Sequence, residues 1–300
     1  MKLLYVLFYI YFIGGILLNL SMSFVRLVRS LSRRLRFVSR SLGKLIYNFY
    51  ENWLYTQVAE GPIPKHIAII PDGNRRWARN QGFDVNVGHE VGYERLEEVL
   101  KWIWDLGVKV VTIYAMSYEN CIKRPDTEKT HLFNLLKRGA DEFVNKRVLE
   151  KYKVRVRFLG RLDMVPENLR AEIMKIEELS SQYSEKILNV AICYGGRQEI
   201  VDAVRALARD VKEGKVSVDE INEDLFIKYL PVTSDLPIPE LSEPDLLIRT
   251  SGELRISNFL LWHIAYSELY FCDVFWPEFR RIDLLRGIRA YQRRHRRFGA

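Results

Sequence analysis

From about residue 65 onward, short apolar runs alternate with longer amphipathic stretches. The apolar runs are nearly continuous, as in strands buried on both faces, and they lie at His66–Ile70, Lys109–Ala115, Val154–Leu159, Leu188–Cys193, Leu246–Arg249 and Leu269–Phe271. The amphipathic stretches predict helices at Glu90–Leu106, Thr127–Glu150, Pro166–Tyr183, Gly196–Lys212, Val218–Leu230 and Ile282–Arg297. This alternation predicts an α/β fold, a single domain with a mainly parallel central sheet flanked by helices.

The start of the chain has a different pattern. No residue from Leu3 to Val25 is charged, and the run LLYVLFYIYFIGGILL is almost wholly apolar. About 20 such residues span a bilayer core. A cleaved signal peptide would usually have a shorter apolar region and an A-x-A-like cleavage site, and a buried core helix is a second alternative. We predict a transmembrane anchor over residues 1–25.

Residues 26–60 predict a basic amphipathic helix and a linker. Apolar residues from Phe24 to Phe49 recur at spacings of one, three or four, and basic residues from Arg26 to Lys44 recur on another face. Such a helix beside an apolar span is expected on an anionic membrane surface, unless its charged face packs on the protein itself. Seven basic residues follow the apolar run, which predicts a single-pass protein with its body, residues 61–300, on the cytoplasmic side.

The net charge of +8 is local to the N-terminal segment. Residues 1–50 hold eight Lys or Arg and no Asp or Glu, so 38 basic and 38 acidic residues remain in 51–300. A neutral body argues against a general nucleic-acid binder and leaves a local basic cleft open. Cys121, Cys193 and Cys272 are scattered and form no CxxC pair, so we expect no disulfide, no zinc site and a reducing compartment.

Polar motifs follow four of the predicted strands, at Pro71–Trp77, Ala115–Asn120, Tyr194–Arg197 and Arg249–Asn258. Because parallel strands end at one edge of a sheet, these motifs should form one site with several anionic groups to hold. We expect Asp72 to bind Mg²⁺ with a diphosphate, while helix N–H groups and Arg76 neutralise phosphate oxygens. The chain has no GxxxxGK[ST] loop, no GxGxxG after the first strand and no DDxxD pair, which argues against P-loop, dinucleotide-binding and trans-prenyl synthase sites.

The segments HIAIIPDGNRRWAR, GHEVGYE, SYEN, CYGGRQEI, DLLIRTSGELRISNFLLWHIAYSELYF and RRFGA resemble the cis-prenyltransferase family of undecaprenyl and dehydrodolichyl diphosphate synthases. The resemblance covers about residues 61–300, in the family order. It implies a homodimeric, Mg²⁺-dependent enzyme that condenses isopentenyl diphosphate in cis onto farnesyl or geranylgeranyl diphosphate. The expected product is a polyprenyl diphosphate, the precursor of a glycosyl carrier lipid such as dolichol. The alternative is a non-catalytic membrane subunit of a heteromeric enzyme.

The resemblance also implies roles for individual residues. It implies catalytic roles for Asp72, Asn74, His89 and Asn120. It implies that substrate is bound by Gly73, Arg76, Trp77, Ser117, Arg124, Gly196, Arg197, Arg249, Glu253, Arg255, Ser257, Arg297 and Gly299. Glu268 matches a carboxylate that shares the metal with Asp72, and Arg297 and Gly299 match a terminal motif that reaches across a dimer.

The chain departs from the family pattern at three places. Pro71 replaces a usual methionine, and the SYEN loop is one residue longer at Ile122-Lys123. Val85 stands where an arginine often helps to hold the allylic diphosphate, so we expect Arg75 or Arg79 to compensate. Apolar side chains, Ala115 among them, are expected to line a tunnel for the growing chain.

Overall fold

The computed structural model describes residues 47–234, 236–238 and 241–294. The chain divides into two compact units, Met1–Leu54 and Tyr55–Ala300. Residues 47–59 are helical and fall within the predicted amphipathic segment. The predicted anchor over 1–25 lies outside the described residues. In the part of the chain that is described, no helix has both the length and the apolar character that a membrane span requires.

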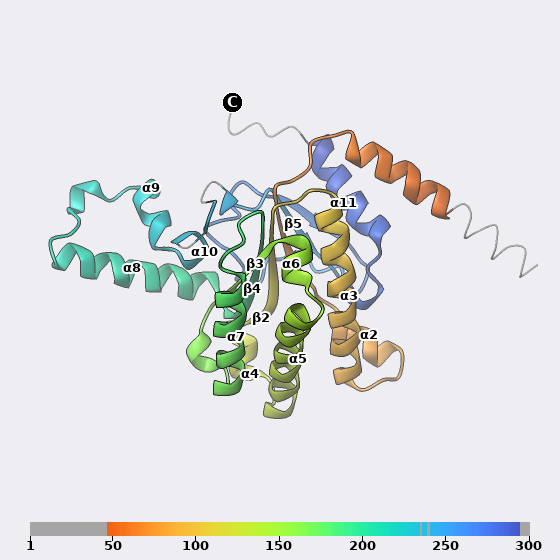
Figure 1. The fold of residues 1–300 in the computed structure, drawn as a ribbon, viewed down its shortest axis with the longest axis horizontal. Helices are drawn as coiled ribbons and strands as arrows, with labels where there is room; N and C mark the ends of the chain where they lie inside the picture. Colours follow the sequence, from red (N-terminus) through yellow and green to blue (C-terminus); the bar gives the residue numbers. More distant parts are fainter. Residues whose placement is uncertain (1–46, 235, 239–240, 295–300) are drawn as a thin grey trace, which may run out of the picture. The chain divides into compact units, whose positions relative to one another are not determined.

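The second unit is built on a six-stranded sheet (Figure 1). Its strands are β1 His66–Ile70, β2 Val110–Ser117, β3 Val154–Leu159, β4 Lys186–Tyr194, β5 Leu246–Arg249 and β6 Glu268–Phe271. Their order is β3-β4-β2-β1-β5-β6, and every neighbouring pair is parallel. The predicted α/β class and parallel sheet are therefore confirmed, and all six carboxyl ends lie at one edge.

Helices connect the strands. They are α2 Asn74–Asn80, α3 Val85–Asp105, α4 Tyr118–Lys123, α5 Asp126–Asn145, α6 Val148–Tyr152, α7 Glu167–Ser180, α8 Gly196–Lys212, α9 Glu223–Phe226, α10 Pro231–Ser234 and α11 Arg281–Arg293. The predicted helix Thr127–Glu150 is divided into α5 and α6, because Arg147 adopts a left-handed backbone conformation with φ of 51°.

The single helix predicted over Val218–Leu230 is wrong. This stretch contains a 3-10 turn at Val218–Glu220, the short α9 and a second 3-10 turn at Ile227–Tyr229. Ser217 accepts a hydrogen bond from the backbone N–H of Asp219, and Asn222 accepts one from that of Leu225. These caps start two separate turns, because Ser and Asn side chains compete with the backbone for hydrogen bonds.

Two of the apolar clusters in the described part of the chain cover the two faces of the sheet. One contains Leu132 and Phe133 of α5 with Leu169 and Ile173 of α7, and Figure 1 shows α3, α5 and α7 side by side over this face. The other contains Ala68 and Leu247 of the sheet with Val232 of α10 and the segment 259–264. Both faces of the strands are therefore buried, which explains why the strand sequences are apolar without alternation.

An irregularity where β2 pairs with β4 brings Cys121 and Cys193 together. The pairing register shifts twice between Tyr114 and Ser117, and Cys193 is left-handed with φ of 46°. A bulge of this kind redirects side chains, and here Cys193 lies in the α5–α7 cluster, whereas Ala191 lies in the other cluster. Cys121 of α4 and Cys193 form a disulfide with Cα atoms 5.5 Å apart. The expectation of no disulfide is wrong, because the pattern of β4 gives no sign of this bulge.

Candidate active site

A cavity of about 790 Å³ opens at the carboxyl ends of β1, β2 and β5. Its apolar lining includes Leu96 of α3 and Leu132, Leu135 and Leu136 of α5, and Ala115 is part of it as predicted. Its charged lining consists of six arginines and three carboxylates: Arg75, Arg76, Arg79, Arg124, Arg249, Arg255, Asp72, Glu119 and Glu253. A hydrocarbon wall beside an arginine-rich one suits a ligand with an anionic head and an apolar tail.

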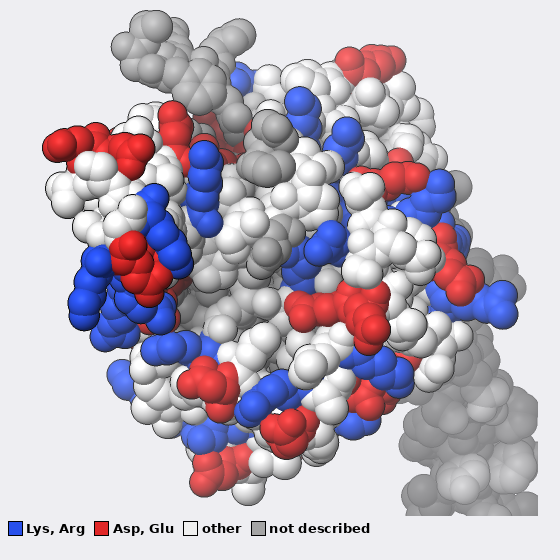
Figure 2. Space-filling view, turned by 60° about the vertical axis from the view of Figure 1, so that its left-hand side comes forward, with Lys and Arg blue, Asp and Glu red and all other residues white. Residues whose placement is uncertain are grey.

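The arginine excess in the cavity contrasts with the rest of the surface. Figure 2 shows Lys and Arg interspersed with Asp and Glu over the face in view. Residues 51–300 have equal numbers of acidic and basic residues. The body of the protein therefore concentrates positive charge at the cavity, which favours a small anionic ligand over an extended nucleic acid.

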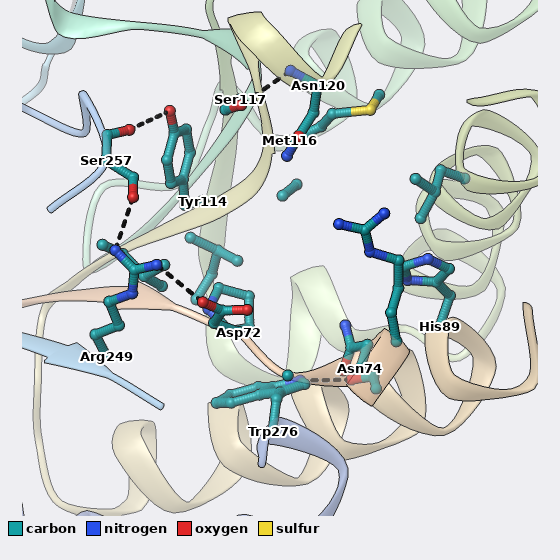
Figure 3. A pocket seen from close by; sticks show the side chains of 18 of the residues that line it. Asp72, Asn74, His89, Tyr114, Met116, Ser117, Asn120, Arg249, Ser257 and Trp276 are labelled. Carbon is teal, nitrogen blue, oxygen red and sulfur yellow. Dashed lines mark hydrogen bonds and ion pairs between the residues drawn. The ribbon is translucent and has the colours of Figure 1, made fainter. Parts of the chain in front are cut away.

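Asp72 lies two residues beyond the end of β1 and points toward Arg249 (Figure 3). Its backbone carbonyl accepts hydrogen bonds from Thr250 Oγ1 at 2.6 Å and from the N–H of Trp276 at 3.0 Å, which fix the loop. Its carboxylate accepts a hydrogen bond from Arg249 Nη2 at 2.8 Å and lies 3.3 Å from Arg76 Nη2. Burial alone would raise the pKa of Asp72, but the hydrogen bond and charge of Arg249, with Arg76, outweigh it and hold the pKa below its usual value. The carboxylate is ionised at neutral pH.

Glycines allow the chain to approach Asp72 and Asn74 closely. Gly73 has φ of 107°, and a Cβ atom there would lie 2.7 Å from Phe275 Cδ1. Gly88 and Gly92 on α3 face α2, where added Cβ atoms would lie 2.3 Å from the Asn74 carbonyl oxygen and 2.6 Å from Asn74 Oδ1. The GHEVGYE segment therefore packs α3 against the start of α2 and positions Asn74 at the cavity wall.

The loop after β5 surrounds Arg249, whose side chain is 4% exposed. Arg249 Nη1 donates hydrogen bonds to Ser257 Oγ at 2.8 Å and to the Arg255 carbonyl oxygen. Arg76 Nη1 donates to Glu253 Oε1 at 2.9 Å, and Arg255 pairs with the other oxygen of Glu253. Arg249, Glu253, Arg255 and Ser257 line the same cavity as Asp72.

This loop has a strained backbone that neighbouring side chains hold. Ser251, Ser257 and Asn258 are left-handed, with φ of 72°, 50° and 64°. Such conformations cost about 1–3 kcal/mol each and persist only where the surroundings fix them. The Tyr114 hydroxyl lies 3.1 Å from the Ser257 carbonyl oxygen, and Asn258 Nδ2 donates to Glu119 Oε1 at 2.9 Å. Tyr114 and Asn258 are cavity residues that sequence reasoning missed, although Asn258 lay within a quoted motif.

The loop after β2 supplies Ser117, Asn120 and Arg124 to the cavity. Ser117 Oγ accepts a hydrogen bond from the Asn120 N–H at 3.1 Å and caps α4 (Figure 3). The Cys121–Cys193 disulfide joins α4 to β4. The loop is therefore fixed to the sheet next to the cavity.

His89 of α3 is 5% exposed and lines the cavity. Its Nε2 lies 3.1 Å from Glu128 Oε1. Burial lowers the pKa of His89 to about 4, against the raising effect of the hydrogen bond to Glu128, and the charge of Arg124 lowers it further. The imidazole is therefore neutral at neutral pH.

Arg75 and Arg79, the residues expected to compensate for Val85, line the cavity, whereas Val85, at the start of α3, does not.

Three predicted substrate-binding residues do not line the cavity. The backbone N–H groups of Gly196 and Arg197 donate to the carbonyl and side-chain oxygens of Asn258, at 2.7 and 2.9 Å. They therefore support the loop after β5. Trp77 Nε1 donates to Glu278 Oε1 at 3.2 Å.

The predicted metal ligand Glu268 does not line the cavity. It is the first residue of β6, and it is paired with Leu246, the first residue of β5. It therefore lies at the amino edge of the sheet, opposite Asp72, and its carboxylate accepts a hydrogen bond from Arg294 Nη1 at 2.6 Å. Within one chain Glu268 does not share a site with Asp72. Arg297 and Gly299 lie outside the described residues.

The side chains that could act as metal ligands bear on whether the site can hold the expected Mg²⁺. Within the described residues, no three His, Cys, Asp or Glu side chains are grouped as a protein-only metal site. Mg²⁺ is commonly bound by one or two carboxylates together with substrate phosphates. Asp72, ionised and on the wall of an arginine-rich cavity, fits a magnesium ion that arrives with a diphosphate.

Comparison with known proteins agrees with this site. Residues 70–299 match the family model described as "Putative undecaprenyl diphosphate synthase". The chain is 49% identical over 263 residues to the geranylgeranyl-diphosphate-specific tritrans,polycis-undecaprenyl-diphosphate synthase of Sulfolobus acidocaldarius, covering 88% of this chain and 98% of that protein. It is 51% identical over 269 residues to the corresponding synthase of Methanopyrus kandleri, covering 89% and 97%.

A solved structure shares the fold. The lavandulyl diphosphate synthase of Lavandula x intermedia, in complex with dimethylallyl diphosphate, matches with a TM-score of 0.75 and 34% identity, over 79% of this chain and 99% of that one. The chain belongs to the undecaprenyl diphosphate synthase family of cis-prenyltransferases, and it is a prenyltransferase.

Proposed function

We propose that this chain is a Mg²⁺-dependent cis-prenyltransferase that adds isopentenyl diphosphate units to geranylgeranyl diphosphate. One observation carries the proposal: Asp72 and the group of Arg249 and Ser257 face one cavity that also has an apolar wall. The starter is inferred from the names of the two archaeal relatives. The product would be a long polyprenyl diphosphate, the precursor of a lipid that carries glycosyl groups.

Two diphosphates require two cationic groups. We assign the allylic diphosphate to Arg75, Arg76, Arg79 and Arg124, which come from α2 and the segment after α4. We assign isopentenyl diphosphate to Arg249, Arg255 and Ser257 in the loop after β5. Asp72 and the allylic diphosphate would hold Mg²⁺, which when bound neutralises charge on the leaving diphosphate. Asp72 also lies 2.8 Å from Arg249, so it joins the two halves of the site.

In the reaction the allylic C–O bond breaks, and the diphosphate leaves with the electron pair. A new C–C bond forms to the alkene of isopentenyl diphosphate, and one proton is then lost from the resulting cation. The arginines stabilise the charge that develops on the leaving group, and the fixed loops align the two substrates. Neutral His89 is able to accept the proton, directly or through the released diphosphate. The leucines of α3 and α5 would exclude water and hold the hydrocarbon chain.

A non-catalytic subunit of a heteromeric enzyme is the second candidate. A supporting subunit would have no need for an ionised Asp72 held by two arginines in a cavity with Ser257 and His89. This arrangement favours the catalytic function.

The test is elongation by the purified chain. The chain is incubated with Mg²⁺, geranylgeranyl diphosphate and labelled isopentenyl diphosphate, and the product is sized by chromatography. We expect extended prenyl diphosphates with one label per added unit. Absence of any extended product, both alone and with a partner extract, would refute the enzyme; a product formed only with the extract would favour the subunit.

A further inference from the structure

Glu128 lies behind the cavity wall and not on it. It is in the first turn of α5, where the helix dipole favours a carboxylate. Its side chain is 12% exposed, so the charge is largely removed from solvent. A carboxylate in such a place is costly unless it is paired, and its partners therefore indicate what it does.

All three partners of Glu128 line the cavity. His89 Nε2 lies 3.1 Å from Oε1, Arg124 Nη1 lies 3.2 Å from the same oxygen, and Arg75 Nη1 lies 3.9 Å from Oε2. These side chains come from three different segments: α3, the residue that follows α4, and α2. One carboxylate therefore connects three separate parts of the wall.

Glu128 gives Arg124 its position. The Arg124 side chain is 16% exposed, and its Nε has no hydrogen-bond partner among the described residues. Burial lowers the pKa of Arg124, and the negative charge of Glu128 opposes this effect. Without that carboxylate the buried guanidinium would lose its ion pair, and we expect it to turn toward solvent.

Glu128 also fixes the tautomer of His89. An ionised carboxylate only accepts hydrogen bonds, and a neutral imidazole carries one proton. Nε2 therefore carries the proton, and Nδ1 is the nitrogen that accepts any further hydrogen bond. This is the form that a proton acceptor requires, and it is set from outside the cavity.

We infer that Glu128 is a positioning residue of the allylic half of the site, which holds Arg75, Arg124 and His89 in the orientations in which they face the cavity. The inference rests on the proposed function, because it assigns these arginines to the allylic diphosphate. It gives Glu128 no contact with the substrate.

Two variants and one control test the inference. Glu128→Gln retains the shape and an acceptor for His89 but removes the charge, and Glu128→Ala removes both. Asp141→Asn is the control, because Asp141 is on the same helix and, among the described residues, pairs with Lys137 at 3.2 Å and with no residue of the cavity. Binding of geranylgeranyl diphosphate is measured by calorimetry without isopentenyl diphosphate. The KM for each of the two substrates is then determined in the elongation reaction. Thermal melts of all variants confirm that they fold.

We expect the dissociation constant for geranylgeranyl diphosphate to rise about 10- to 100-fold in Glu128→Ala and less in Glu128→Gln, as for the loss of a charged hydrogen bond. The KM for isopentenyl diphosphate should change less than about threefold. In a double-mutant cycle the effect of Glu128→Ala should be smaller in an Arg124→Ala background, because one of its three partners is gone, and should add to that of Arg255→Ala. If wild-type and both Glu128 variants bind geranylgeranyl diphosphate equally, or if both KM values rise together, the inference is wrong. A wild-type chain that does not elongate would instead refute the proposed function.

Discussion

The Cys121–Cys193 disulfide allows a quantitative prediction about stability. It joins residues separated by 72 positions. In the chain-entropy model, a closed loop of this length removes about 4 kcal/mol of conformational freedom from the unfolded state at 25 °C. For a chain of this size each kcal/mol corresponds to roughly 2–4 °C in Tm. Reduction, or the Cys193→Ser change, should therefore lower Tm by roughly 10 °C.

The assay compares thermal melts with and without a dithiol reductant. The control is Cys272→Ser, because Cys272 is the free cysteine and its Sγ donates a weak hydrogen bond to the Arg249 carbonyl oxygen at 3.7 Å. The control should respond to reductant as the wild type does, and Cys193→Ser should not respond. Alkylation under denaturing, non-reducing conditions should label one cysteine. Labelling of all three, or equal Tm values with and without reductant, would refute the reasoning.

Three further predictions concern the site and the core. Gly73→Ala adds a Cβ atom 2.7 Å from Phe275 at φ of 107°, so we expect destabilisation of about 1–3 kcal/mol in urea titration and elongation reduced at least tenfold. Tyr114→Phe removes the hydroxyl that contacts the Ser257 carbonyl oxygen, and should raise the KM for isopentenyl diphosphate about three- to tenfold with a stability loss near 1 kcal/mol. Burial lowers the pKa of His89 from 6.5 to about 4, so the neutral imidazole contributes to the free energy of unfolding fully above pH 6.5, and this contribution is lost as the pH falls toward 4. The loss amounts to about 3 kcal/mol in all. The free energy of unfolding of His89→Gln should therefore fall less than that of the wild type over this range, and an equal fall in the two proteins would contradict the assignment.

The parts of the fold that follow from local pattern could be predicted from the sequence. The apolar strands β1, β3 and β5 have the predicted bounds, because burial on both faces leaves a continuous signal. The polar residues at the carboxyl ends of β1, β2 and β5 meet in one cavity, because a parallel sheet brings those ends to one edge. Asp72, Arg249 and Ser257 were found for this reason.

The parts that depend on packing could not be predicted. Cys193 reaches Cys121 only through a bulge in β4. Glu128 contacts its partners through a tertiary arrangement of three segments, and its sequence context is that of an ordinary first-turn acid. Glu268 was assigned to the metal from the resemblance alone, and the register of β5 and β6 places it at the other edge of the sheet.

The most direct measurement is the elongation rate of Asp72→Asn beside wild type and Asp141→Asn. The variant retains the size of the side chain and removes the charge that would hold Mg²⁺ with the allylic diphosphate. We predict a loss of at least about 100-fold in kcat, because a charge-stabilising group at the leaving diphosphate is gone, with wild-type activity in the control. An Asp72→Asn protein that elongates geranylgeranyl diphosphate at close to the wild-type rate would contradict the central claim.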